Sequence, residues 1–143
     1  MPTEQYFEVS CSPDRAFDGF TDRAKIVDWW GDPNVYKTVS WTADLRDGGS
    51  WRAEFEAPDG ARFGAEGMYV SIDRPTRLEW TWKADWEPEV EKTIHMSFIP
   101  SPAGTKMIVA TEGHLSAEAQ SQDEAAWAMI VGWFNRAVSE QGE

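Results

Sequence analysis

Side chains that could carry acid–base chemistry are few in this chain of 143 residues. It has two histidines, and an imidazole that titrates near neutral pH is a natural general acid or base. His114 follows a strand-like segment and precedes a helical one, so we expect it at the rim of a pocket. The alternation around His95 directs that side chain to an outer surface. Since no nucleophile or orienting carboxylate stands beside His114 in the sequence, it is a candidate acid–base residue without a recognisable partner.

The other polar candidates lie on one predicted strand, residues 62–72. Because successive side chains alternate between the two faces of a strand, Arg62, Glu66 and Met68 share one face and Tyr69 lies on the other. If the first face lines a cavity, Arg62 or Glu66 is a polar anchor for a ligand and Met68 is apolar lining. If the second face does, the Tyr69 hydroxyl takes that role. The pattern leaves both open, and Glu66 and Tyr69 are further candidate catalytic groups.

Little in the sequence supports a metal site or a catalytic nucleophile. Cys11 is the only cysteine, which excludes an internal disulfide and a zinc site built from cysteines. No histidine or lysine stands beside it to activate the thiol. The Gly-rich segment 47–49 lacks the lysine and the following helix of a phosphate-binding loop, and there is no Gly-x-Ser-x-Gly motif. We therefore expect no metal and no cofactor, and an enzyme is less favoured than a binding protein.

The charge balance limits the classes of binding partner that we expect. There are 13 Lys and Arg against 25 Asp and Glu, a formal net charge of −12. This balance disfavours nucleic acids and anionic membrane surfaces, which both attract basic proteins. No segment approaches the roughly 20 apolar residues of a membrane span, and the first nine residues do not resemble a signal peptide. We expect a cytoplasmic protein.

Tryptophan is the most unusual component of the chain. Trp80 and Trp82 lie two apart on one predicted strand, and Trp127 and Ile130 lie on one helical stripe, so these four are predicted to form a pocket wall. Trp86, in a charged loop with a proline, is either a lid or an exposed ring. We assign Trp29, Trp30, Trp51 and Trp133 to the scaffold. The nine tryptophans are Trp29, Trp30, Trp41, Trp51, Trp80, Trp82, Trp86, Trp127 and Trp133.

Hydrophobic periodicity places these residues on elements. Ser12-Pro13-Asp14 predicts the start of one short helix and Thr21-Asp22 that of a second, which the breaking segment 31–34 ends. A spacing of two predicts strands over residues 3–10, 35–43, 51–56, 62–72, 78–83, 90–99 and 105–111.

The C-terminal segment changes to a helical period. Ser121-Gln122-Asp123-Glu124 has the pattern of a capping box, and a short helical turn capped by Ser116 can precede it. A run of strands followed by a helix is typical of α+β folds, in which the helix covers one face of an antiparallel sheet. The stripe of this helix comprises Trp127, Ile130, Val131, Phe134 and Val138.

Short motifs in a fixed order add a family resemblance. They are Ser12–Phe17, Val27–Trp30, Asp47–Trp51, Gly67–Val70 with Pro75–Trp82, Gly104–Met107 and Gly132-Trp133. Over about residues 4–140 the chain resembles the SRPBCC (START/Bet v-like) superfamily, and within it the activator of heat-shock protein 90 ATPase homologue-like family, in its bacterial single-domain form. The resemblance implies one domain over residues 1–143 with a helix-grip fold. In that fold a curved antiparallel sheet of about six or seven strands wraps around a long C-terminal helix, with two short helices after the first strand.

The resemblance also implies three classes of function. The favoured one is binding of a small hydrophobic or aromatic molecule in a cavity between the sheet and the C-terminal helix. The second is a cyclase- or hydratase-type enzyme acting on a polyketide-like substrate. The third is a stress- or chaperone-associated module, which we disfavour because the eukaryotic activators carry a further N-terminal domain that contributes to chaperone binding. A homodimer is left open.

Overall fold

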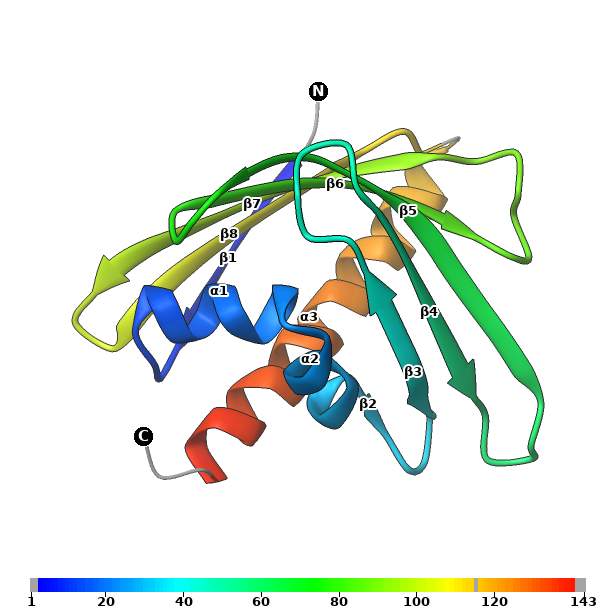
Figure 1. Cartoon of the computed structure of the whole chain (residues 1–143), viewed down its shortest axis with the longest axis horizontal. Helices are drawn as coiled ribbons and strands as arrows, with labels where there is room; N and C mark the ends of the chain where they lie inside the picture. The colour runs from blue at the N-terminus through cyan, green and yellow to red at the C-terminus, as the bar shows by residue number, and fades with distance from the viewer. Residues whose placement is uncertain (1–2, 115, 141–143) are drawn as a thin grey trace.

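The computed structural model describes residues 3–114 and 116–140, which form three helices and one eight-stranded sheet (Figure 1). In chain order the elements are β1 (Thr3–Val9), α1 (Pro13–Thr21), α2 (Arg23–Trp29), β2 (Gly31–Asp32), β3 (Tyr36–Ala43), β4 (Ser50–Glu56), β5 (Arg62–Asp73), β6 (Arg77–Ala84), β7 (Lys92–Ser101), β8 (Gly104–Glu112) and α3 (Ala117–Glu140). None of these helices is long and apolar enough to cross a membrane.

The sheet is an antiparallel meander that the first strand completes. Its order is β1-β8-β7-β6-β5-β4-β3-β2, so β1 pairs with the last strand of the run. The sheet curls around α3, and α1 and α2 lie on its open side (Figure 1). The α+β helix-grip fold is thus confirmed.

The eighth strand, β2, was not predicted, because Gly31 and Pro33 indicate only the end of the second short helix. Gly31 has a φ of 136° and pairs with Lys37, in a conformation that few other residues adopt. A side chain there would meet the Tyr36 carbonyl oxygen at 2.6 Å, so the short strand depends on glycine.

Both short helices begin where the capping residues predict. The backbone N–H of Arg15 donates to Ser12 Oγ over 3.3 Å, and that of Ala24 donates to Asp22 Oδ1 over 3.0 Å. These contacts satisfy N–H groups that have no partner inside the first turn. The two caps position Phe20 and Trp30 against the open side of the sheet.

The predicted start of the C-terminal helix is wrong by one turn. Helix α3 begins at Ala117, and the Ala119 N–H donates to Ser116 Oγ over 3.0 Å. Residues 117–120 contain no helix breaker, so the Ser116 cap and the following segment join into one helix, and the 121–124 capping pattern falls inside it. In consequence Asp123 lies one turn before Trp127, on the same side of the helix.

Aromatic rings fill most of the space between the sheet and the helices. Trp41 stacks on Trp51 at a centroid separation of 5.1 Å, and Trp51 contacts Trp80 at 5.3 Å. Trp30 contacts both Trp41 and Phe20, and Phe20 in turn contacts Phe134 of α3 at 5.0 Å. Such pairs add about 0.5–1.5 kcal/mol each to the free energy gained by burial alone.

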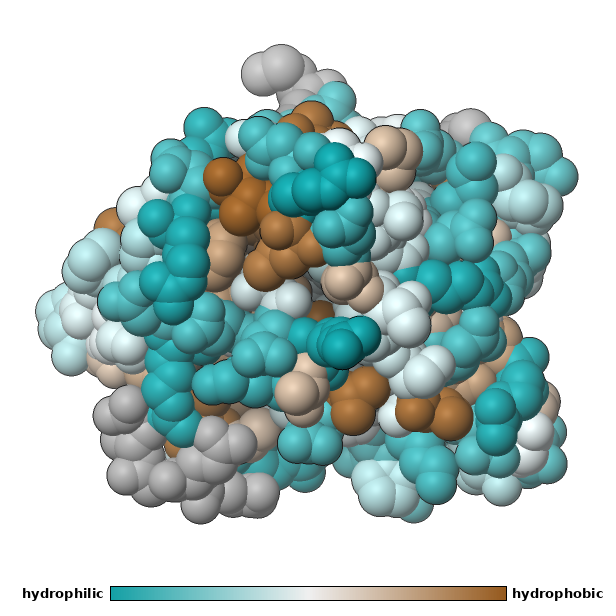
Figure 2. Space-filling view, in the orientation of Figure 1, coloured by the Kyte–Doolittle hydropathy of each residue, from teal (hydrophilic) through white to brown (hydrophobic). Residues whose placement is uncertain are grey.

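Charged groups occupy the outer face of the sheet. Arg52 pairs there with Glu54, Glu66 and Asp85, at 2.6, 3.0 and 2.9 Å. Polar residues dominate the face seen in Figure 2, with a few hydrophobic patches between them. The sheet therefore separates an aromatic interior from a charged exterior.

Candidate functional site

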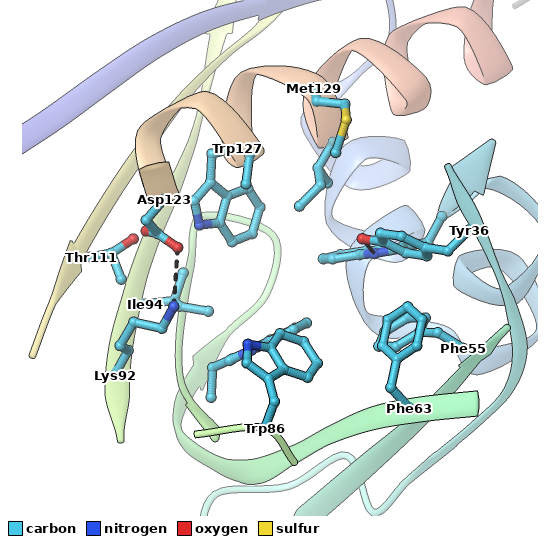
Figure 3. A pocket seen from close by; sticks show the side chains of 14 residues that line it. Tyr36, Phe55, Phe63, Trp86, Lys92, Ile94, Thr111, Asp123, Trp127 and Met129 are labelled. Carbon is cyan, nitrogen blue, oxygen red and sulfur yellow. Dashed lines mark hydrogen bonds and ion pairs between the residues drawn. The ribbon is translucent and has the colours of Figure 1, made fainter. Parts of the chain in front are cut away.

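A cavity of about 220 Å³ lies between the concave face of the sheet and the N-terminal half of α3 (Figure 3). Seven of its fourteen lining residues are aromatic, whereas only two are charged. The lining residues are Trp30, Tyr36, Phe55, Phe63, Trp82, Trp86, Lys92, Ile94, Thr111, Asp123, Ala126, Trp127, Met129 and Ile130.

One end of the cavity is purely aromatic. Tyr36, Phe55 and Phe63 stand in mutual contact, with centroid separations of 5.1 Å for Tyr36–Phe55 and 5.5 Å for the other two pairs. The Tyr36 hydroxyl accepts a hydrogen bond from Trp30 Nε1 over 3.2 Å, and burial raises the pKa of Tyr36. The phenol is therefore neutral at physiological pH, so this end carries no charge.

The other end holds an ion pair (Figure 3). Lys92 Nζ donates to Asp123 Oδ1 over 3.3 Å, and only 19% and 13% of these side chains is exposed. His114 Nε2 lies 3.2 Å from the other carboxylate oxygen without the alignment of a hydrogen bond, and its ring is almost fully buried. Asp123 is thus held between two basic side chains, in surroundings from which most water is excluded.

Strand parity and helix period explain how these two charges meet. Lys92 shares the inward face of β7 with Ile94, Met96 and Phe98 and is the first of that row. Asp123 lies one turn before Trp127 on the inward side of α3. Sequence reasoning missed both residues, although the parity of β7 would have indicated Lys92.

Three of the predicted lining residues, Trp82, Trp127 and Ile130, do line the cavity. Trp80 and Tyr69 are fully buried and lie outside this lining. Their rings stack at 6.4 Å in the core, where Trp41 and Trp51 also contact Trp80.

Arg62, Glu66 and Met68 do not line this cavity. Phe63 and Tyr69 take the inward parity of β5, so these three side chains lie on the outer face. Met68 is 50% exposed, and Glu66 pairs with Arg52 across the outside of the sheet. The structure therefore brings neither Glu66 nor Tyr69 to the cavity. His114 does not line it either, but contacts the lining residue Asp123.

Two further tryptophans belong to the site. Trp30, assigned to the scaffold, lines the cavity and stacks on Trp82 at 5.9 Å. Trp86 also lines it, although 59% of this residue is exposed, and packs edge-to-face on Phe63 at 5.6 Å. An exposed ring at a cavity edge fits the mouth of the pocket.

The sequence matches the family model for Activator of Hsp90 ATPase homolog 1-like protein over residues 10–137. The chain belongs to this family. No curated protein sequence matches the chain significantly.

Solved structures of AHSA1-like proteins share the fold. An AHSA1 protein from Silicibacter pomeroyi superposes with a TM-score of 0.83 at 20% identity, covering 99% of both chains. An AHSA1-like protein from Aeromonas hydrophila gives 0.82 at 23% identity, covering 99% of this chain and 94% of that one. DynU16, a protein of the dynemicin biosynthetic locus, gives 0.76 at 16% identity, covering 96% of this chain and 47% of its own.

The chemistry available to this AHSA1-like chain is that of a shaped apolar cavity with one polar end. Within the described residues, no group of three His, Cys, Asp or Glu side chains could hold a metal ion. Lys92 and Asp123 offer a strong donor and a strong acceptor side by side. The site is therefore suited to holding an aromatic body and contacting one polar substituent.

Proposed function

We propose that this protein binds a small aromatic molecule in the cavity between the sheet and α3. The observation that carries the proposal is the lining, in which seven of fourteen residues are aromatic around an open volume of about 220 Å³. Ligand pockets are mostly apolar, with few polar groups that set orientation. An apolar cavity of about 150 Å³ is already enough to bind benzene, so this one has room for a substituted ring or two fused rings.

Membership of the AHSA1-like family supports the proposal, because the SRPBCC fold commonly holds hydrophobic ligands between its sheet and its long helix. Edge-to-face and offset contacts with the rings of the wall favour a planar aromatic ligand over an aliphatic one of similar size.

Calorimetric titration with toluene, naphthalene and, as the non-aromatic comparison, methylcyclohexane tests this function. We expect saturable binding of both aromatic probes and weaker binding of methylcyclohexane. Absence of saturable binding by every probe would overturn the proposal.

A matched pair of variants on α3 assigns the binding to the cavity. Ala126 lines the cavity, whereas Ala128 is exposed on the same helix. Ala126→Phe is expected to fill the space and weaken naphthalene binding at least tenfold, and Ala128→Phe to leave it unchanged. Equal affinity in the two variants would place the binding elsewhere.

A second candidate function, favoured by one observation, is acid–base catalysis on a polyketide-like substrate in the same cavity. His114 lies 3.2 Å from the carboxylate of the cavity-lining Asp123, close enough for a proton to pass between the two groups. Incubation with a thioester of a linear poly-β-ketone is expected to give a cyclised product with the wild type and much less with His114→Gln. Equal product formation would exclude the role of His114.

A further inference from the structure

We infer that the cavity selects phenols, with the aromatic body among the rings and the hydroxyl between Lys92 and Asp123. This inference rests on the proposed aromatic-binding function and adds the chemical class of the ligand. It starts from the unequal ends of the cavity, one formed by Tyr36, Phe55 and Phe63 and the other by the ion pair (Figure 3).

Lys92 and Asp123 retain unused hydrogen-bonding capacity. An ammonium group has three N–H donors, and a carboxylate has about four lone-pair positions. In the described part of the chain, Lys92 makes one hydrogen bond, to Asp123 over 3.3 Å, and Asp123 has Lys92 and His114 as its partners. At 3.3 Å the bond is longer than the 2.7–2.9 Å of a strong charged contact. A ligand group can therefore add to the pair without breaking it.

The charge of the pair decides which polar group fits. Lys92 and Asp123 carry opposite charges, so together they present no net charge to a ligand. A ligand carboxylate would meet repulsion from Asp123, and a ligand ammonium group would meet repulsion from Lys92, in a site with little water to screen either. A hydroxyl avoids both penalties, because its O–H donates to Asp123 while its oxygen accepts from Lys92.

The rest of the wall favours an aromatic carrier for that hydroxyl. Trp86 and Trp127 lie between the two ends of the cavity (Figure 3). A planar ring between them keeps aromatic contacts along its length and still presents a substituent to the ion pair. A phenolic hydroxyl lies in the plane of its ring and is a rigid extension of it, so its placement costs little conformational entropy.

Four probes with one ring system test the selectivity. They are naphthalene, 2-naphthol, 2-naphthoate and 2-naphthylmethylammonium, titrated calorimetrically into the wild-type protein at neutral pH. Hydrogen bonds to charged groups are stronger than those to neutral ones, so we expect 2-naphthol to bind at least about tenfold more tightly than naphthalene. We expect both charged probes to bind less tightly than 2-naphthol.

A double variant assigns the preference to the ion pair. Lys92→Met combined with Asp123→Leu removes both charges together, so that neither is left buried alone. It is expected to bind naphthalene within about threefold of the wild type and to lose the preference for 2-naphthol. The matched control, Arg52→Met with Asp85→Leu, removes an ion pair on the outer face and should leave all four affinities unchanged.

The outcomes separate this inference from the function beneath it. If no probe binds, the aromatic-binding function fails and the inference fails with it. If naphthalene and 2-naphthol bind equally well, or if a charged probe binds best, binding stands and phenol selectivity is overturned. If the Lys92 and Asp123 double variant keeps the preference, the hydroxyl lies elsewhere and the inference is overturned as well.

Discussion

On strand β5, Glu66 and Tyr69 lie three residues apart and on opposite faces of the sheet. Tyr69 is fully buried and stacks on Trp80, whereas the Glu66 side chain is 56% exposed and pairs with Arg52 over 3.0 Å. Both are polar residues that the sequence made candidates for the cavity, and neither lies in it. The two faces of this one strand are therefore stabilised by different interactions.

The inner face gains its free energy from burial of rings. A buried aromatic side chain removes 150–250 Å² from water, at about 25 cal/mol per Å² of apolar surface. The outer face gains little from its ion pairs, since exposed pairs contribute about 0–1 kcal/mol each. Equal numbers of contacts on the two faces therefore carry very different energies, and variants on each face can test this.

Trp80→Ala is expected to have the largest effect. The Trp80 side chain is fully buried between Tyr69 and Trp51, so its removal costs the burial free energy and leaves a cavity. We expect the free energy of unfolding to fall by about 3–5 kcal/mol, measured by urea denaturation. Lys83→Ala, three residues further along β6 and outside the buried layer, should change it by less than about 0.5 kcal/mol. A cost below 1 kcal/mol for Trp80→Ala would contradict the description of the inner face.

Gly67→Ala is expected to have the next largest effect on the free energy of unfolding. It tests how closely the inner face is packed. A methyl group at Gly67 would run into the Thr81 carbonyl oxygen and the Trp51 indole nitrogen, which hydrogen-bond each other over 3.1 Å. Overpacking of this kind costs about 1–3 kcal/mol.

Gly132, on an exposed part of α3, is the control for that change. It has open space around it, so Gly132→Ala should stabilise the protein by about 0.5–1 kcal/mol in the same urea assay. If the two glycine variants behaved alike, the crowding at Gly67 would not be real.

Tyr69→Phe tests a polar atom on the inner face. No described residue gives the Tyr69 hydroxyl a hydrogen bond of good geometry, and burial raises the pKa of Tyr69 to about 12. Removing an unsatisfied buried hydroxyl is expected to leave stability unchanged or raise it by about 1 kcal/mol. A loss of 2 kcal/mol would show instead that the hydroxyl is satisfied.

The same variant has a distinct pH dependence. Since the folded-state pKa of Tyr69 lies above the unfolded value of about 10, folding favours the neutral phenol. The stability associated with this group is complete below pH 10 and is lost as pH rises toward 12. The wild type should therefore lose more stability than Tyr69→Phe over that interval, measured by urea denaturation at each pH.

Much of the fold was predictable because local signals agree with the tertiary structure. Alternation gave the long strands, and Ser12 and Asp22 gave the helix starts. The start of α3 was mispredicted because two serines, Ser116 and Ser121, both precede helical residues, and sequence alone does not say which cap is used.

The candidate site was less predictable than the fold. Trp82 and Trp127 were identified because a large apolar residue on an inward face must meet the core. Whether such a residue borders open space or solid packing depends on all its neighbours, so Trp80 was misplaced. The face of β5 was ambiguous because both parities carry apolar residues, as Met68 and Phe63 show. Asp123 was missed because it falls within the capping-box pattern of residues 121–124.

Asp85→Asn, on the outer face, is expected to have the smallest effect on the free energy of unfolding. Arg52 holds the Asp85 carboxylate through bonds of 3.0 and 2.9 Å, and these hydrogen bonds lower the pKa of Asp85 below its usual value. A lowered folded-state pKa stabilises the protein above the unfolded value near 4, and this stability is lost as pH falls through the folded value.

Because the Asp85 side chain is 44% exposed, we expect the variant to cost less than about 1 kcal/mol at pH 7 and still less in 1 M salt or at pH 3. Urea denaturation at the two pH values and salt concentrations measures this. A cost comparable to that of Trp80→Ala, or one that salt and acid leave unchanged, would mean that the outer face carries structural free energy of the same order as the aromatic interior.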